Sequence, residues 1–258
     1  MTETELLKEE IFCLNYELKI FAGFVNHGRL ERWVKNYTDK VTEQSHIQRY
    51  ELASGFVNDK MVLDIACGSG HGSYLLADQG KAKEITAIDL DAETIRYASF
   101  RNQHPNINFL QGDGMKFCRE NYFEVIVSFE TIEHLPDANS FLENINRSLK
   151  KDGFFIVSTP ISGKAFDSSP SNVYHKQEWG FKNFHNLVSE HLVIDKVFLQ
   201  LYPWMDDSLA GRVKRKLSNK TMNCHSEIFE YTANRDAEFP SLGKNRKGYQ
   251  IVFCKKKI

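Results

Sequence analysis

The chain has 258 residues, of which 41% are hydrophobic and 26% charged, as in an ordinary soluble globular protein that buries a substantial core. Its formal net charge of −1 argues against a dedicated polyanion binder, so we do not expect nucleic acid as a partner. No apolar run approaches the roughly 18 residues that span a bilayer, and the acidic start is unlike a targeting signal. Five scattered cysteines fit a reducing compartment, so we expect a cytoplasmic protein; the sequence specifies no oligomeric state.

Residues 1–55 are predicted to form helices that lie outside a central sheet. Apolar residues recur at helical spacing over residues 6–21, and a second helix is expected over residues 46–53. This N-terminal part could cover a ligand pocket, or it could simply pack against the sheet. The side chains expected at the rim of such a pocket are His46, Arg49 and Tyr50.

A strand, a glycine-rich turn and a helix follow between residues 61 and 77. Residues 61–66 form a short, nearly continuous apolar run that predicts a buried parallel strand, and three glycines come next at alternate positions. Missing side chains let the backbone approach a ligand, and the N–H groups at the helix start face it. The next predicted strand, residues 85–88, ends in Asp89, where an acidic side chain meets ribose hydroxyls. This arrangement is typical of a nucleotide-binding unit.

Asp64 narrows the class of ligand. A carboxylate inside the first strand would repel a pyrophosphate and suits a cationic ligand that carries an amino group. The stretch Val-Leu-Asp-Ile-Ala-Cys-Gly-Ser-Gly closely resembles the first motif of class I S-adenosylmethionine-dependent methyltransferases, so the resemblance implies S-adenosyl-L-methionine as the cofactor. With Arg49 from the N-terminal part, the residues expected to bind it are Asp64, Ala66, Gly68, Gly70, Asp89, Leu90, Asp113, Gly114, Met115, Phe129 and Glu130.

The rest of the chain alternates strands with helices, which predicts an α/β fold with a doubly wound, mostly parallel sheet. The resemblance implies the Rossmann-like methyltransferase fold with seven strands, the last of which pair antiparallel. We expect two parts: N-terminal helices over residues 1–55 that cover the cofactor pocket, and a methyltransferase domain over residues 56–258. The domain has an insertion over residues 202–247 that carries a basic run.

Glu130, Glu133 and His134 follow the fourth predicted strand. If a helix starts there, the three side chains share one face and form a divalent-metal half-site for magnesium or manganese, with His175 as a further ligand. His134, Glu130 and His175 are then the candidate catalytic residues. The alternative is that no metal binds: Glu130 lines the cofactor, Glu133 pairs locally, and His134 acts as a general base.

Three resemblances bear on the acceptor. The segments Glu-x-x-Glu-His and His-x-x-Glu-Trp resemble those of metal-dependent methyltransferases that act on the terminal 2′-hydroxyl of small RNAs; Glu-x-x-Glu-His also resembles that of quinone O-methyltransferases. Over residues 40–200 the chain resembles methyltransferases of bacterial glycan assembly. We therefore expect O-methylation of a sugar hydroxyl in a bacterial glycan or its precursor. The alternatives are a quinone or small aromatic acceptor, a terminal ribose, or a non-catalytic binding subunit that keeps the fold.

Overall fold

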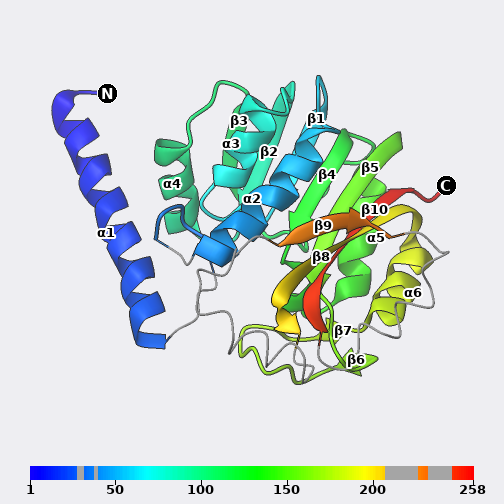
Figure 1. Ribbon diagram of the computed structural model, residues 1–258. Helices are drawn as coiled ribbons and strands as arrows, with labels where there is room; N and C mark the ends of the chain where they lie inside the picture. Colours follow the sequence, from blue (N-terminus) through cyan, green and yellow to red (C-terminus); the bar gives the residue numbers. More distant parts are fainter. Residues whose placement is uncertain (28–31, 38–39, 207–225, 232–245) are drawn as a thin grey trace. The chain divides into compact units, whose positions relative to one another are not determined.

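The computed structural model describes residues 1–27, 32–37, 40–206, 226–231 and 246–258 (Figure 1). The chain divides into two compact units, residues 1–117 with 123–127 and residues 118–122 with 128–258. The predicted boundary after residue 55 falls inside the first unit and stays a prediction. Among the residues described, no helix combines the length and the apolar character that crossing a membrane requires.

The first unit holds the parallel strands and the N-terminal helices. Its elements are α1 (Glu3–His27), α2 (Lys40–Ser54), β1 (Met61–Ile65), α3 (His71–Asp78), β2 (Glu84–Asp89), α4 (Ala92–Arg101), β3 (Ile107–Gln111) and the start of β4 (Phe123–Phe129). β1 pairs in parallel with both β2 and β4, and β2 pairs in parallel with β3. Val62 to Ile65 are buried, as the apolar run predicts for a strand covered on both faces.

The second unit begins where β4 ends. It contains η1 (Ile132–His134), α5 (Ala138–Ser148), β5 (Leu149–Pro160), β6 (Phe166–Asp167), β7 (Glu178–Trp179), α6 (Phe181–His191), β8 (Leu192–Asp206), β9 (Glu227–Glu230) and β10 (Arg246–Lys256). α5 starts earlier than its apolar pattern indicates because Asp137 caps it: its carboxylate accepts a hydrogen bond from the Ser140 N–H at 3.1 Å. β10 pairs antiparallel with β5 and β8, which confirms the predicted antiparallel end.

The hydrogen-bonded strand order is β3-β2-β1-β4-β5-β10-β8-β9, which makes eight strands where seven were predicted; β6 and β7 form a separate pair. The additional strand is β9, inside the predicted insertion, where Phe229 lies opposite Leu199 of β8. A four-residue strand amid polar sequence has too weak a pattern to be read without its partner. The basic run of the insertion lies outside the described residues.

Candidate functional site

Asp64 is a fully buried carboxylate of the first unit. It lies in β1 and is fully inaccessible to solvent. Its carboxylate accepts hydrogen bonds from the Ser73 hydroxyl on α3 at 2.6 Å and from the Tyr50 hydroxyl on α2 at 3.1 Å. Burial raises the pKa of Asp64 to about 7, because desolvation penalises the charged form. A bound cation would favour the charged form of this carboxylate.

The loop after β1 bends through left-handed backbone. Ala66, Gly68 and Gly70 have φ values of 59°, 54° and 80°. At Gly70 an added Cβ would lie 2.7 Å from the Ala98 Cβ and 2.7 Å from the Phe109 ring, so glycine is required there for space as well as conformation. At Gly68 an added Cβ would meet nothing within 4 Å. The backbone at Gly68 therefore borders open space that a ligand could enter.

Asp89 connects this loop to the end of β2. Its Oδ2 accepts a hydrogen bond from the Gly68 N–H at 3.1 Å, and its Oδ1 accepts one from the Asp91 N–H at 3.0 Å. Arg32, in the segment after α1, lies 3.7 Å from Asp89 and 3.3 Å from Asp91. Each carboxylate oxygen keeps a second lone pair that could accept from a ribose hydroxyl.

The other predicted cofactor residues of the first unit follow the strands β2 and β3. Leu90, directly after β2, is 67% exposed, so its large apolar side chain is free to pack against a flat apolar group of a ligand. Asp113, after β3, accepts a hydrogen bond from the Met115 N–H at 3.0 Å across Gly114. This local bond is an Asx turn, so it explains Asp113 without a ligand.

The three predicted rim residues lie together on α2. Arg49 and Tyr50 are buried, and Tyr50 is committed to Asp64. His46 stacks on Trp33 with 5.5 Å between ring centroids. Desolvation, and then the Arg49 charge, hold the pKa of His46 well below its ordinary value, so this imidazole is neutral at physiological pH. α2 thus contributes the Tyr50 hydroxyl, which donates a hydrogen bond to the buried Asp64 carboxylate.

Glu130 opens the candidate acceptor region of the second unit, directly after the buried Phe129. It has a left-handed φ of 53°; its N–H donates to the Ser158 carbonyl at 3.1 Å, and the Ser158 hydroxyl donates to its Oε1 at 2.7 Å. The expected α-helix is absent here, because residues 132–134 form a single 3₁₀ turn. Glu130 is therefore held by β5 and does not share a helical face with Glu133.

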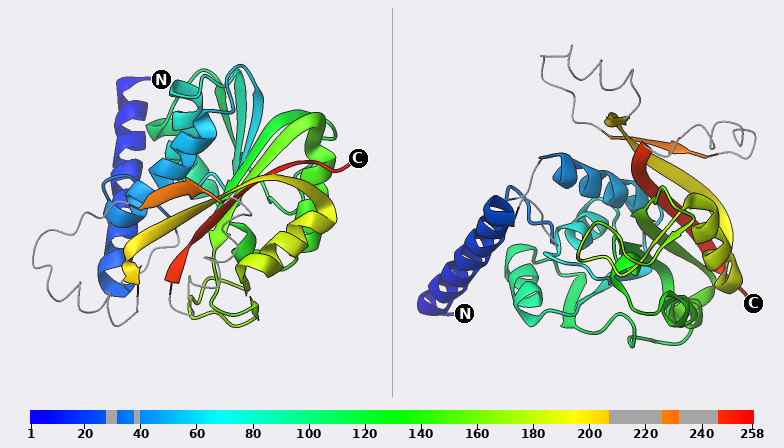
Figure 2. Two further views of the ribbon diagram at one scale, coloured as in Figure 1. Left: turned by 45° about the vertical axis from the view of Figure 1, so that its right-hand side comes forward. Right: turned by 90° about the horizontal axis from the view of Figure 1, so that it is seen from below.

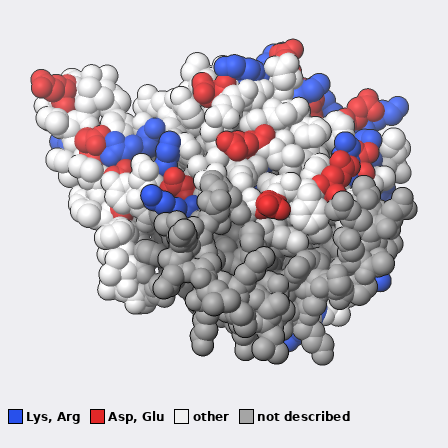
Figure 3. Space-filling view, in the orientation of Figure 1, with Lys and Arg blue, Asp and Glu red and all other residues white. Residues whose placement is uncertain are grey.

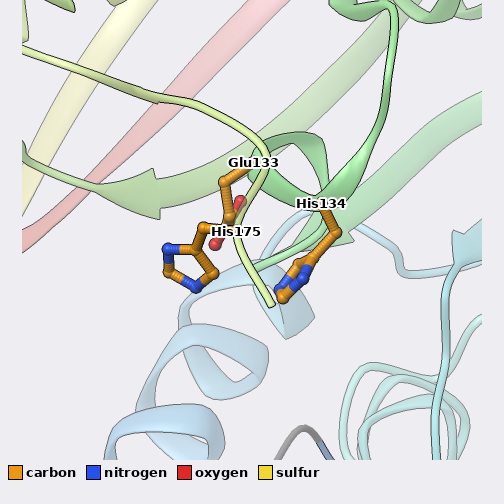
Figure 4. Close-up of side chains that lie close together, drawn as sticks. All are labelled: Glu133, His134 and His175. Carbon is orange, nitrogen blue, oxygen red and sulfur yellow. The ribbon is translucent and has the colours of Figure 1, made fainter. Parts of the chain in front are cut away.

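Glu133, His134 and His175 form a compact cluster (Figure 4). Each offers one ligand atom, and these three atoms lie within 4.8 Å of one another. Glu133 is fully buried, and its Oε2 accepts a hydrogen bond from the Thr159 hydroxyl at 3.1 Å. The loop that carries His175 is fastened to η1, because the Lys176 N–H donates to the Glu133 carbonyl at 2.8 Å. Residues far apart in sequence are thus brought together.

Neighbouring groups orient both imidazoles. The Nδ1–H of His134 donates to the Tyr174 carbonyl at 3.0 Å, and the Nδ1–H of His175 donates to the Glu178 carboxylate at 2.7 Å. The Asn172 amide donates to Nε2 of His175 at 2.8 Å, which fixes that nitrogen as an acceptor. A histidine held by a carboxylate in this way is typical of metal ligands.

The cluster therefore fits a metal in its chemistry: two imidazole nitrogens and one carboxylate could hold it. Glu130, predicted as a fourth ligand, is not part of this group. Two imidazoles and one carboxylate suit manganese, iron or zinc better than magnesium, which prefers oxygen ligands alone. Without a metal, the same geometry presents His134 as a general base.

Residues 63–157 match a family model described as a methyltransferase domain. These residues therefore form a methyltransferase domain, and the chain is similar to S-adenosylmethionine-dependent methyltransferases. It is 30% identical over 115 residues to the ubiquinone biosynthesis O-methyltransferase of Rickettsia typhi, which covers 44% of this chain and 46% of that protein. It is 27% identical over 125 residues to a fatty-acid O-methyltransferase of Mycolicibacterium smegmatis, covering 45% of each. The chain thus spans about half the length of the curated relatives it matches.

A solved structure of this methyltransferase class has the same fold. Phosphoethanolamine N-methyltransferase 2 of Haemonchus contortus, in complex with S-adenosylhomocysteine, superposes with a TM-score of 0.57 at 13% identity. The match covers 83% of this chain and 52% of that one. The predicted α/β methyltransferase fold is confirmed, and residues 63–157 match the methyltransferase domain that the sequence predicted; the roles of single site residues stay predictions.

The sequence predicted the charged groups of the candidate site but not several of the side chains that form hydrogen bonds or ion pairs with them. Ser73 follows the last glycine of the loop, and Glu178 lies in the motif that contains His175, so both were within reach. Arg32 and Asn172 carry no signal in the sequence, because only the folded chain brings them to Asp89 and to His175.

Asp64 predicts a pH dependence of ligand binding. S-adenosylhomocysteine carries an ammonium group, which would lower the pKa of Asp64 below its ligand-free value of about 7. Binding then releases a proton below pH 7, so affinity should rise as the pH approaches 7 and level off above it. Titration calorimetry in buffers of different ionisation enthalpy measures both quantities. Asp64→Asn should remove the proton release; an unchanged release in that variant would show that another group titrates.

Proposed function

We propose that the protein is an O-methyltransferase that methylates a hydroxyl group beside a second oxygen atom, in a sugar of a bacterial glycan or its precursor. The observation that carries this proposal is the cluster of Glu133, His134 and His175. An alcohol is barely ionised at neutral pH, so it needs a base or a metal before it can accept a methyl group.

The first unit supplies the donor side of the reaction in this proposal. S-adenosylmethionine, when bound, provides an electrophilic methyl group on a sulfonium with a good leaving group. Asp64 would balance the positive charge, Asp89 would accept hydrogen bonds from the ribose hydroxyls, and the exposed Leu90 would pack against the adenine. The residues thus bind and orient the donor, and orientation alone can supply several orders of magnitude in rate.

The second unit supplies the acceptor side. His134, oriented by the Tyr174 carbonyl, would take the hydroxyl proton at Nε2 in a reaction without metal. With a metal, one imidazole nitrogen from each of His134 and His175 and the Glu133 carboxylate would hold it, and it would lower the pKa of the acceptor hydroxyl. The donor set favours manganese over magnesium. Neighbouring oxygens on one acceptor could then bind together.

A quinol or small phenol is the second candidate acceptor. The resemblance to the ubiquinone biosynthesis O-methyltransferase of R. typhi favours it, and a quinol also can carry neighbouring oxygens. A terminal ribose would be the third; no observation on the described residues favours it. In the remaining alternative the chain binds S-adenosylmethionine without catalysis and serves as a subunit.

An acceptor screen with labelled S-adenosylmethionine tests this proposal. We expect chelator-treated protein to be inactive and manganese to restore methyl transfer to a sugar-nucleotide acceptor but not to a quinol or a small RNA. His175→Ala should bind S-adenosylhomocysteine normally but should show no manganese binding by calorimetry. Added manganese should not restore methyl transfer in this variant. The matched control is His191→Ala, a histidine of α6 that contacts Asn139.

Each contrary outcome identifies the part that fails. Full activity in chelator would show that transfer needs no metal, and His134 would then be the candidate general base. Transfer to the quinol alone would reverse the acceptor assignment. Binding of S-adenosylhomocysteine without transfer to any acceptor would favour the alternative in which the chain is a non-catalytic binding subunit.

A further inference from the structure

α1 carries a stripe of apolar side chains on its outward face. The stripe residues follow one another at alternating intervals of four and three, the spacing of a coiled-coil seam. Each is between 45% and 65% exposed. The stripe consists of Leu7, Ile11, Leu14, Leu18, Phe21 and Val25.

The opposite, inner face of α1 packs against its own unit through ion pairs as well as apolar contacts. Arg96 of α4 pairs with Glu9 at 2.8 Å, while Arg101 pairs with Glu10 at 2.6 Å and with Glu17 at 3.0 Å. Figures 1 and 2 show α1 lying along the outside of α4. Three ion pairs thus fix the rotation of the helix and hold the stripe outward.

A small apolar cluster confirms this orientation. Cys13 and Tyr16 of α1 pack on Val34 and Tyr97, and the Tyr16 hydroxyl shares a hydrogen bond of 2.8 Å with Thr94. α1 therefore carries apolar side chains on both faces, and the six residues of the stripe are the ones that its own unit leaves exposed. The stripe is available to another partner.

The size of the stripe matches an interface. Six half-exposed large side chains present on the order of 500 Å² of apolar surface, at the upper end of what monomers ordinarily expose in one patch. Two such stripes would together bury on the order of 1,000 Å², which is where specific interfaces begin. The helix length of 25 residues accommodates six seam layers.

We propose that α1 pairs antiparallel with α1 of a second copy, so that the methyltransferase is a homodimer. The stripe is self-complementary in this direction: Leu7 faces Val25 of the partner subunit, Ile11 faces Phe21 of the partner subunit, and Leu14 faces Leu18 of the partner subunit. Every apolar layer is thereby filled, and no charged residue enters the seam.

Charge selects the antiparallel direction. Residues 3–10 hold four glutamates against one lysine, and Figure 3 shows the acidic end of α1 above a mostly uncharged edge. A parallel pair would place two acidic ends side by side. An antiparallel pair keeps the two acidic ends apart, and it also opposes the helix dipoles. Beside the seam, Asn15 lies near Asn15 of the partner subunit.

Sedimentation of the full chain tests the dimer. At tens of micromolar we expect twice the monomer mass, and Leu14→Glu combined with Leu18→Glu should raise the dissociation constant by roughly a hundredfold or more. The matched control is Leu6→Glu, an equally exposed leucine of α1 outside the stripe, which should stay dimeric. Far-ultraviolet circular dichroism checks that α1 remains folded. A monomeric wild type, or a dimer that survives the double substitution, overturns the proposal.

Cysteine cross-linking tests the direction. Asn15→Cys should form a covalent dimer under mild oxidation, because position 15 meets its own copy only in the antiparallel pair. Leu7→Cys should not, because Leu7 meets its own copy only in a parallel pair. Wild-type protein under the same oxidant measures the background from the native cysteines. Cross-linking through Leu7→Cys and not through Asn15→Cys would overturn the antiparallel arrangement.

Discussion

Asp89→Ala is expected to weaken S-adenosylhomocysteine binding about a hundredfold, as measured by titration calorimetry. Hydrogen bonds to a charged group are worth about 1.5–3 kcal/mol each, and the substitution removes the proposed bonds to the ribose hydroxyls. It also removes the acceptor for the Gly68 and Asp91 N–H groups, so the loop loses its anchor to β2. The combined loss is about 3 kcal/mol, because these bonds are not additive.

Two variants separate the ribose contact from a general disturbance. Asp89→Asn keeps one carbonyl acceptor and should lose less affinity than Asp89→Ala. Glu93→Ala removes an exposed carboxylate of α4 that pairs with Lys19, so it should leave affinity unchanged. If Asp89→Ala binds as tightly as the wild type, the ribose assignment is wrong.

Gly70→Ala is expected to destabilise the fold by about 3 kcal/mol, the sum of left-handed strain and overpacking. The φ of 80° is costly for alanine, and its Cβ would press on Ala98 and Phe109. For a chain of this size the melting temperature should fall by roughly 6–12 °C. Differential scanning calorimetry of the ligand-free protein measures the change.

Gly68→Ala is the matched comparison for Gly70→Ala. Its φ of 54° brings similar strain, but its Cβ would point into open space, so it should cost only about 1–2 kcal/mol. It should instead impair S-adenosylhomocysteine binding, because the added methyl group enters the space proposed for the ligand. Equal destabilisation by both substitutions would show that crowding at Gly70 does not matter.

Local pattern was enough to predict the parallel core. The apolar run before Gly68 and the acidic ends of the first two strands indicated β1, its loop and β2, because burial and turn chemistry act within a few residues. The same reasoning wrongly placed Glu130 on one helical face with Glu133 and His134. Its side chain is held by Ser158 of β5, a contact between residues 28 apart that no helical spacing describes.

The metal-binding hypothesis also depends on a contact between residues that are distant in the sequence. Glu133 and His134 are neighbours in the chain, yet their cluster depends on His175, which the loop before β7 brings to them. Periodicity also predicted α1 but not which face would pack. Ion pairs with Arg96 and Arg101 decide that, and they form between residues more than 80 positions apart.

The two backbone bonds to Asp89 have a consequence for turnover. Because Gly68 and Asp91 already fix the rotamer of this carboxylate, the acceptor for the ribose is preorganised before any donor arrives. Little conformational entropy is left to lose on binding at this point. Spent product and fresh donor should therefore exchange without refolding of the loop.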